Sequence, residues 1–252
     1  MWAMFSNNSM IETTHEILSD YKLREKTIEN IIALAAKYEV DGINLDFENI
    51  YEEDKDLYTR FVIELYPRLH EYGMNLSVDV TAPDGSATWS LCFDRYNISR
   101  NCDYIIFMAY DQCNEKKAGP NAGYDWVKVN LDKFLRDIDS SKIVLGIPLY
   151  SRTWKNPENV GQSVPYVVDM DDIESILPAD AEITWDEDLK QNVANYTKNG
   201  NRYTMWIDDI KALEPTLDLC LEENLAGVAF WEKDRETEDI WRLVAEKFGD
   251  AS

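Results

Sequence analysis

The stretch VDGINLDFEN, residues 40–49, decides the fold. Alternate side chains of a β-strand share a face, so one side of this stretch carries small and polar residues: Gly42, Asn44, Asp46 and Glu48. The residues between them are apolar and suit a layer of covering helices: Ile43, Leu45 and Phe47. A polar row inside a protein is costly unless it has partners or a function. The pattern therefore predicts a strand over residues 40–47, in a helix-covered sheet, with chemistry at its end.

A pair such as Asp46 and Glu48 has a second interpretation, because acidic residues are also common at helix N-termini and at solvated strand ends. The apolar face of the same stretch argues against it, and so does its place at the end of a parallel strand, where the sites of barrel enzymes gather. Neighbouring carboxylates repel, so one of the two has a raised pKa and holds a proton near neutral pH. We expect Glu48 to be this general acid. Asp46, deeper in the strand, is expected to orient a group or to stabilise positive charge.

Short apolar segments rich in β-branched and aromatic residues lie on both sides of this stretch. They predict further strands over residues 2–6, 75–81, 104–110, 143–149 and 226–231. Segments with apolar residues at helical spacing alternate with them and predict helices over residues 24–38, 55–72, 126–138, 208–223 and 236–248. Such an alternation is typical of βα units around one parallel sheet.

Residues 151–207 interrupt this rhythm. They contain three prolines, many acidic residues and two short alternating pieces, over residues 181–185 and 203–207. This composition predicts a small β-rich insertion between the strand over residues 143–149 and the helix that begins at residue 208. We therefore expect one domain over residues 1–252, with the insertion inside it.

The acidic balance of the 252 residues narrows the possible partners. Lys and Arg number 25 against 48 Asp and Glu, which gives a net charge of −23. Such a charge repels phosphate backbones and anionic membrane surfaces, and no apolar run is long enough for a spanning helix. We therefore expect neither nucleic acid binding nor membrane insertion. The four irregularly spaced cysteines and two histidines favour buried or free thiols over a zinc site or a disulfide framework, so neither a metal nor a cofactor is expected.

The central stretch resembles the D-G-x-[DN]-x-D-x-E signature of the chitinase-type glycoside hydrolases of family 18. Three further motifs of that family follow in the same order: FMAYDQ at residues 107–112, GIPLYSRTW at 146–154 and GVAFWEKD at 227–234. The resemblance implies a TIM-type (β/α)8 barrel. Within the family, the motifs look most like those of bacterial spore-cortex lytic N-acetylglucosaminidases. The resemblance also implies retaining hydrolysis of β-1,4-linked N-acetylglucosamine-containing glycans, of peptidoglycan or chitin type, assisted by the substrate's own acetamido group.

The resemblance assigns roles to single residues. Glu48 matches the general acid, Asp46 the residue that positions the acetamido N–H, and Tyr110 the hydroxyl donor to the acetamido oxygen. The residues that match substrate-binding positions are Asn44, Met108, Asp111, Tyr150, Arg152 and Trp231. Other interpretations remain open: the tyrosines and the tryptophan as core residues, and the arginine as a surface ion partner. The aromatic residues of the insertion suit either a sugar cleft or a small core of their own: Trp185, Tyr196, Tyr203 and Trp206.

Two features depart from the family pattern. Asn44 stands where many chitinases have Asp, so we expect Asp46 to be firmly ionised and a proton relay along the strand to be weak. In the family the acidic motif ends the fourth strand. Because only one predicted strand precedes it here, we expect a barrel that lacks its first two βα units.

The expected partner is an N-acetylated glycan, bound by a monomer. The resemblance implies an extracellular, cell-wall or spore location, although no signal peptide is visible at the start of this chain. Two alternatives to the enzyme are a non-catalytic carbohydrate-binding relative of the same fold and an inactive fragment. The presence of Glu48 favours the enzyme over both.

Overall fold

A computed structural model describes residues 1–113, 117–159 and 165–249. The chain forms two compact units, each built from two segments. The first comprises Met1–Met108 and Lys133–Val144, and the second comprises Ala109–Asp132 and Leu145–Ser252.

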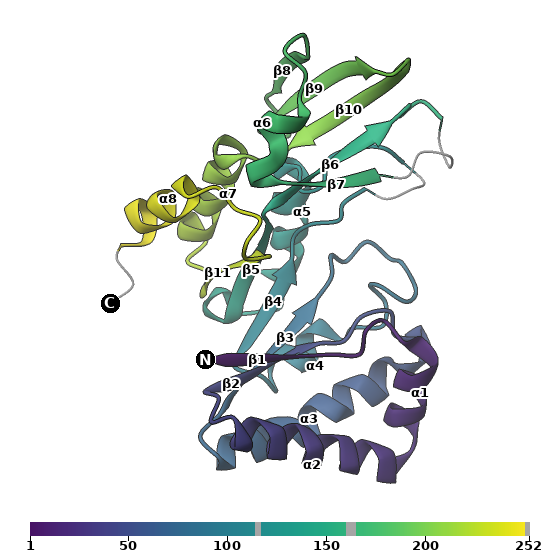
Figure 1. The fold of residues 1–252 in the computed structure, drawn as a ribbon. Coiled ribbons are helices and arrows are strands. Elements are labelled where there is room, and N and C mark those ends of the chain that lie inside the picture. Colours follow the sequence, from purple (N-terminus) through teal and green to yellow (C-terminus); the bar gives the residue numbers. More distant parts are fainter. Residues whose placement is uncertain (114–116, 160–164, 250–252) are drawn as a thin grey trace. The chain divides into compact units, whose positions relative to one another are not determined.

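The first unit contains a parallel sheet of four strands in the order β1-β2-β3-β4 (Figure 1). The strands are β1 (Trp2–Ser6), β2 (Gly42–Asp46), β3 (Asn75–Val80) and β4 (Tyr104–Met108). The helices of this unit are α1 (Ile11–Ser19), α2 (Tyr21–Lys37), α3 (Lys55–Glu71) and α4 (Arg95–Ser99). The four predicted strands are confirmed, whereas α1 was not predicted. The helix predicted from residue 24 begins at Tyr21, because Asp20 caps it and accepts the backbone N–H groups of Lys22 and Leu23.

The two faces of β2 are those that the alternation predicts. Ile43 and Leu45 are fully buried, and Phe47 is 5% exposed. The Phe47 ring stacks on Tyr58 and Phe61 of α3, with ring centroids 5.8 and 5.6 Å apart. The apolar face of the strand is therefore fixed against a helix, which leaves Asn44 and Asp46 on the opposite face.

The second unit contains β11 (Gly227–Trp231), which pairs with β5 (Ile143–Pro148). The first two residues of β5 precede the second segment of this unit. Helix α5 (Tyr124–Phe134) lies largely in this unit, and α7 (Ile210–Glu222) and α8 (Asp239–Phe248) lie wholly in it. The predicted helix over residues 236–248 begins three residues later than expected. The other predicted elements are confirmed with shifts of a few residues at their ends.

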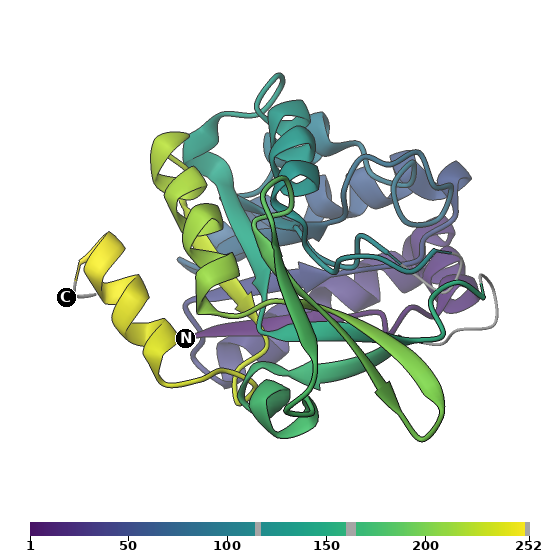
Figure 2. The ribbon, with the colours of Figure 1, turned by 90° about the horizontal axis from the view of Figure 1, so that it is seen from above.

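The insertion is an antiparallel sheet of five strands in the order β7-β6-β10-β9-β8. Its strands are β6 (Tyr150–Lys155), β7 (Pro165–Asp169), β8 (Glu182–Asp186), β9 (Gln191–Lys198) and β10 (Asn201–Ile207), with the short α6 (Ile173–Ile176) between β7 and β8. In Figure 2 the long hairpin of β9 and β10 is light green. The predicted β-rich insertion is confirmed, but only β8 and β10 were recognised as strands, because β6 and β9 mix polar and apolar residues without strict alternation.

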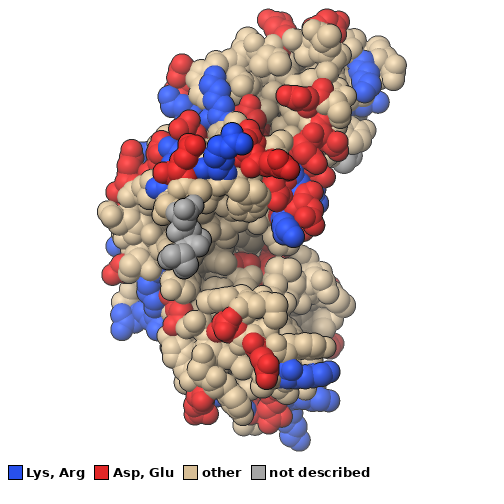
Figure 3. Space-filling model, turned by 60° about the vertical axis from the view of Figure 1, so that its left-hand side comes forward, with Lys and Arg blue, Asp and Glu red and all other residues tan. Residues whose placement is uncertain are grey.

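All four cysteines are buried and free, as their irregular spacing predicts. In the part of the chain that the structure describes, no helix is long and apolar enough to cross a membrane. The acidic excess is visible on the face shown in Figure 3, where Asp and Glu side chains gather over the second unit with Lys and Arg among them.

Candidate active site

The polar face of β2, in the first unit, forms an acidic cluster of candidate residues. Asn44 donates from Nδ2 to Ser77 Oγ at 3.0 Å and to Asp79 Oδ1 at 2.7 Å, both on β3. Asp46 pairs in register with Ser6 of β1, whose side chain is hydrogen-bonded to it. The strand pairing thus places polar side chains of β1 and β3 on either side of the predicted row.

Glu48 lies two residues beyond the end of β2, and its side chain is partly buried. Asn7, the residue after β1, holds its backbone on both sides: the Glu48 N–H donates to Asn7 Oδ1 at 3.0 Å, and Asn7 Nδ2 donates to the Glu48 carbonyl oxygen at 2.8 Å. Such a bidentate amide contact fixes the direction in which the strand end leaves the sheet. Asn7 was not predicted, because the contact joins positions 41 residues apart.

Burial controls the carboxyl of Asp46. Desolvation raises its pKa, and the hydrogen bond with Ser6 opposes this only in part. The firm ionisation of Asp46 stays a prediction. Its Oδ1 atom is buried and accepts no hydrogen bond within the described residues.

Asp79 has the most strongly raised pKa of the acids in the β2 cluster. It is 8% exposed, and burial raises its pKa to about 8. The hydrogen bond from Asn44 acts in the opposite direction, and the charges of Asp46 and Glu48 raise the pKa further. Asp79 was not predicted, since LSVDV at residues 76–80 has the pattern of an ordinary strand with alternating polar and apolar residues.

A second cluster of candidate residues lies in the second unit and centres on Asp111. Tyr150 donates its hydroxyl to Asp111 Oδ1 at 2.8 Å, and Arg152 Nη2 donates to the same oxygen at 2.5 Å. Burial raises the pKa of the Tyr150 hydroxyl, and the Asp111 charge raises it further, so Tyr150 stays a neutral donor. The Tyr110 ring meets the Tyr150 ring edge-on, with centroids 6.5 Å apart. Four of the predicted residues are thus brought together.

A fully buried amide supports this group. Asp111 has a positive φ of 59°, and its N–H donates to Asn121 Oδ1 at 3.1 Å. Asn121 Nδ2 in turn donates to the Tyr150 carbonyl oxygen at 3.0 Å. Asn121 therefore ties the loop after β4 to the start of β6. Sequence reasoning missed it, because its role depends on two backbone positions on different segments.

The remaining predicted residues have different exposures. Trp231 ends β11 with 38% of its surface exposed, as a platform for a ligand requires. Met108 is 6% exposed at the end of β4, in the first unit, and so offers little surface. The Arg152 side chain is 16% exposed, too little for a simple surface ion pair, and its Nε has no partner among the described residues. Tyr150 is 5% exposed and donates its hydroxyl to Asp111, so it has both a core environment and a polar partner.

The insertion aromatics fall into two groups. Tyr196 is 8% exposed and stacks on Tyr203, with ring centroids 5.2 Å apart, so this pair packs within the insertion. Trp185 carries the Lys211 ammonium over its ring at 3.7 Å. Trp206 is partly buried and lies directly opposite Arg152 in the pairing of β10 with β6.

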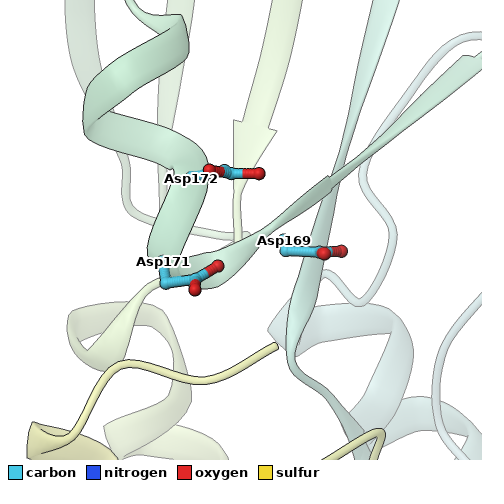
Figure 4. Close-up of side chains that lie close together, drawn as sticks. All are labelled: Asp169, Asp171 and Asp172. Carbon is cyan, nitrogen blue, oxygen red and sulfur yellow. The ribbon is translucent and has the colours of Figure 1, made fainter. Parts of the chain in front are cut away.

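Asp169, Asp171 and Asp172 place carboxylate oxygens within 4.8 Å of one another (Figure 4). Asp169 is already paired with Arg235, which also binds Glu232 at 2.7 Å. Exposed acidic groups often gather in this way without an ion. The guanidinium of Arg235 therefore balances part of the negative charge of this cluster.

The comparison with protein families decides the assignment. Glycosyl hydrolases family 18 matches residues 12–236. The chain belongs to this family. The cortical fragment-lytic enzyme of Bacillus subtilis is 25% identical over 243 residues, which cover 92% of this chain and 55% of that protein. The chain thus spans about half the length of this relative.

Solved structures agree on the fold. The chitinase from Chromobacterium violaceum superposes with a TM-score of 0.89 at 24% identity, over 97% of this chain and 78% of that one. The Bacillus cereus spore cortex-lytic enzyme SleL superposes with a TM-score of 0.86 at 24% identity, over 98% and 59% of the two chains. The predicted α/β fold of the TIM-barrel type is therefore confirmed. The absence of two βα units before the first strand stays a prediction.

Proposed function

We propose that this family 18 chain hydrolyses β-1,4-linked N-acetylglucosamine-containing glycans with retention, through the substrate's acetamido group. The observation that carries the proposal is Asp46, a partly buried carboxyl whose Oδ1 lacks a hydrogen-bond donor among the described residues. A buried acceptor without a donor is costly unless a ligand supplies one. The N–H of a 2-acetamido group is such a donor, and Glu48 follows two residues later.

The first step uses both carboxyl groups of the motif. Asp46 accepts the acetamido N–H, and the acetamido carbonyl oxygen attacks the anomeric carbon as Glu48 gives its proton to the leaving glycosidic oxygen. The C–O bond to the leaving sugar breaks, and an oxazolinium ion forms beside the Asp46 carboxylate. In the second step Glu48 takes a proton from water, and the water oxygen opens the oxazolinium ring at the same carbon. Two inversions give net retention.

The residues of the second unit fit the binding of the sugar. Tyr110 is proposed to donate its hydroxyl to the acetamido oxygen, and Trp231 to support the apolar side of the pyranose ring. The group of Asp111, Tyr150 and Arg152 offers a carboxylate, a hydroxyl and a guanidinium that are already held by one another. Groups with fixed orientation lose little entropy when they bind a hydroxyl-rich ligand. Asn44 and Met108 stay as predicted substrate neighbours.

The names of the relatives favour a bacterial wall glycan. The cortical fragment-lytic enzymes and the spore cortex-lytic enzyme support peptidoglycan as substrate and a spore or cell-wall location. Chitin-type oligosaccharides are the second candidate, supported by the similarity to human di-N-acetylchitobiase, at 23% identity over 90% of this chain. We further propose that the chain acts as a monomer, without a metal or cofactor.

The test compares the wild-type chain with Glu48→Gln on an N-acetylchitooligosaccharide and on purified peptidoglycan, with release of reducing ends as the readout. Loss of a general acid lowers the rate by about 10²- to 10⁴-fold. The matched control is Glu53→Gln, the same chemical change on an exposed side chain five residues further on, which should keep wild-type turnover.

Proton NMR of the fresh product completes the test by reporting its anomeric configuration, which should be β. An α product contradicts the retaining mechanism. Binding of either glycan by the wild-type chain without turnover contradicts the enzyme and supports the carbohydrate-binding relative.

A further inference from the structure

His15 lies on α1, the helix that follows β1, and binds the residue that precedes α3. It donates from Nδ1 to both carboxylate oxygens of Asp54, at 3.0 Å to Oδ1 and at 2.9 Å to Oδ2. The His15 side chain is 44% exposed, whereas Asp54 is 1% exposed. A carboxylate with so little access to water needs a partner, and His15 supplies one. The contact therefore fixes α1 against the start of α3.

Thr14, the residue before His15 on α1, binds the side chain that holds Glu48. Asn7 Nδ2 donates to Thr14 Oγ1 at 2.8 Å and to the Glu48 carbonyl oxygen at 2.8 Å. The Thr14 hydroxyl donates to the Met10 carbonyl oxygen at 2.8 Å, which turns its lone pairs toward Asn7. Adjacent residues of one helix thus hold Asn7 on one side and Asp54 on the other.

These contacts close a ring around the segment that leads from β2 to α3. Glu48 is at the first end of this segment and is held through Asn7, and Asp54 is at the last end and is held through His15. Both ends are therefore tied to α1, and all the contacts lie in the first unit. The members of this ring of contacts are Asn7, Thr14, His15, Asp54 and Glu48.

The imidazole of His15 can add a charge to the ring of contacts. The hydrogen bond to Asp54 raises its pKa above the usual value, and the charges of Asp54, Glu53 and Glu16 act in the same direction. The Tyr51 ring meets the imidazole edge-on, with ring centroids 5.8 Å apart. An imidazolium gives the buried carboxylate a counter-charge and a charge-assisted hydrogen bond, whereas a neutral imidazole gives only an N–H group. The ring of contacts is therefore tightest when His15 is protonated.

We propose that His15 is a positioning residue for the general acid, which holds the backbone of Glu48 in place through this ring of contacts. A general acid must lie within hydrogen-bond reach of the oxygen that it protonates, and a small displacement lowers the rate steeply. His15 acts on Glu48 and not on the sugar, so its loss lowers kcat more than it raises KM. This inference rests on the proposed function.

The test replaces His15 in two ways. His15→Ala removes the N–H group and the charge and should lower kcat about fivefold or more, with KM changed less than about twofold. His15→Asn keeps an N–H donor that cannot titrate, so it should recover part of this loss. The ratio of the wild-type kcat to that of His15→Asn cancels the other titrating groups. This ratio should fall toward one as pH rises through the His15 pKa, which a merely structural His15 would not cause.

The matched control is His70→Ala. His70 is the other of the two histidines, its side chain is also 44% exposed, and its Nε2 binds Asp103 at 3.1 Å in the same unit. It lies outside the ring of contacts, so the variant should keep the wild-type kcat. Its proton NMR spectrum retains the His15 imidazole alone and assigns that signal, from which the His15 pKa is measured. If the His15 variants do not fold, the kcat of the wild-type chain should still show a step at this pKa.

The outcomes separate the two proposals. A wild-type chain that turns over neither glycan overturns the proposed function and the role of His15 with it. An active wild-type chain whose His15→Ala variant keeps the same kcat overturns the inference alone. The inference also fails if His15→Asn is no faster than His15→Ala, if the kcat ratio does not change with pH, or if His70→Ala slows the chain as much. With unfolded His15 variants, a wild-type kcat without a step at the His15 pKa overturns it.

Discussion

Asp208 gives the sharpest prediction about stability. It follows β10, is 2% exposed, and accepts a hydrogen bond from Gln191 Nε2 at 2.6 Å on Oδ1. Its Oδ2 is buried without a partner among the described residues. Burial raises the pKa of this carboxyl well above its usual value, and the Asp209 charge adds to the effect. The folded chain therefore holds a proton on Asp208 that the unfolded chain loses.

The sign and size of the effect follow from proton linkage. Below about pH 4 both states are protonated, and the raised pKa costs no stability. Above that pH the unfolded chain releases its proton while Asp208 keeps its own, so the free energy of unfolding falls by about 1.4 kcal/mol per pH unit up to the folded pKa. Asp208→Asn keeps the shape and an oxygen for Gln191 but has no proton to release. The free energy of unfolding of the variant should thus rise relative to that of the wild type as pH increases, by up to about 1.4 kcal/mol per pH unit while Asp208 stays protonated.

Urea denaturation at pH 5, 6 and 7 and constant ionic strength measures this difference. Subtracting the wild-type free energy of unfolding from that of Asp208→Asn cancels the other titrating groups. Asp188→Asn, an exposed aspartate of the same unit, shows what the loss of one surface charge does by itself. A difference between Asp208→Asn and wild type that does not change with pH, or that shrinks as pH rises, would refute the reasoning.

Three further predictions concern single contacts. Phe47→Ala removes a ring that stacks on two aromatic rings of α3 and should cost about 3–5 kcal/mol of unfolding free energy in urea; a cost under about 1 kcal/mol would contradict the packing. Tyr150→Phe removes the hydroxyl that donates to Asp111 and should raise KM more than it lowers kcat, whereas an unchanged KM would argue against a binding role. The pKa of His15 is raised, first by its hydrogen bond to Asp54, so its contribution to stability is present below the unfolded pKa and is lost as pH rises through the folded one. Asp54→Asn should lower the His15 pKa in an NMR titration, and an unchanged titration would exclude the contact.

Local patterns predicted much of the fold. The period of two in residues 40–47 assigned the faces of β2 correctly, and helical spacing located α2, α3, α5, α7 and α8 to within a few residues. These patterns suffice because the periodicity of a strand or a helix is visible in the residues of that segment alone. β6, β7 and β9 escaped prediction, and in β6 and β9 polar and apolar residues do not alternate strictly.

The candidate site residues likewise comprise some that the sequence predicted and some that it did not. Asp46, Glu48, Tyr110 and Tyr150 could be named from three motifs in family order, because each motif is contiguous. Asn7 and Asn121 could not be named, since each binds the backbone of a segment that is distant in sequence. The raised pKa of Asp46 could not be predicted either, because burial causes it and the residues next to Asp46 in the sequence do not reveal burial.

The sequence by itself determined that a row of polar residues ends a helix-covered strand, and that the chain resembles family 18. Only the tertiary structure decided which side chains complete that row. The register of β2 against β3 places Asp79 at the end of the Asn44 amide, 35 residues away, and the surrounding sheet removes water from the Asp79 carboxyl. Periodicity is a property of one segment, whereas register and desolvation belong to the assembled sheet.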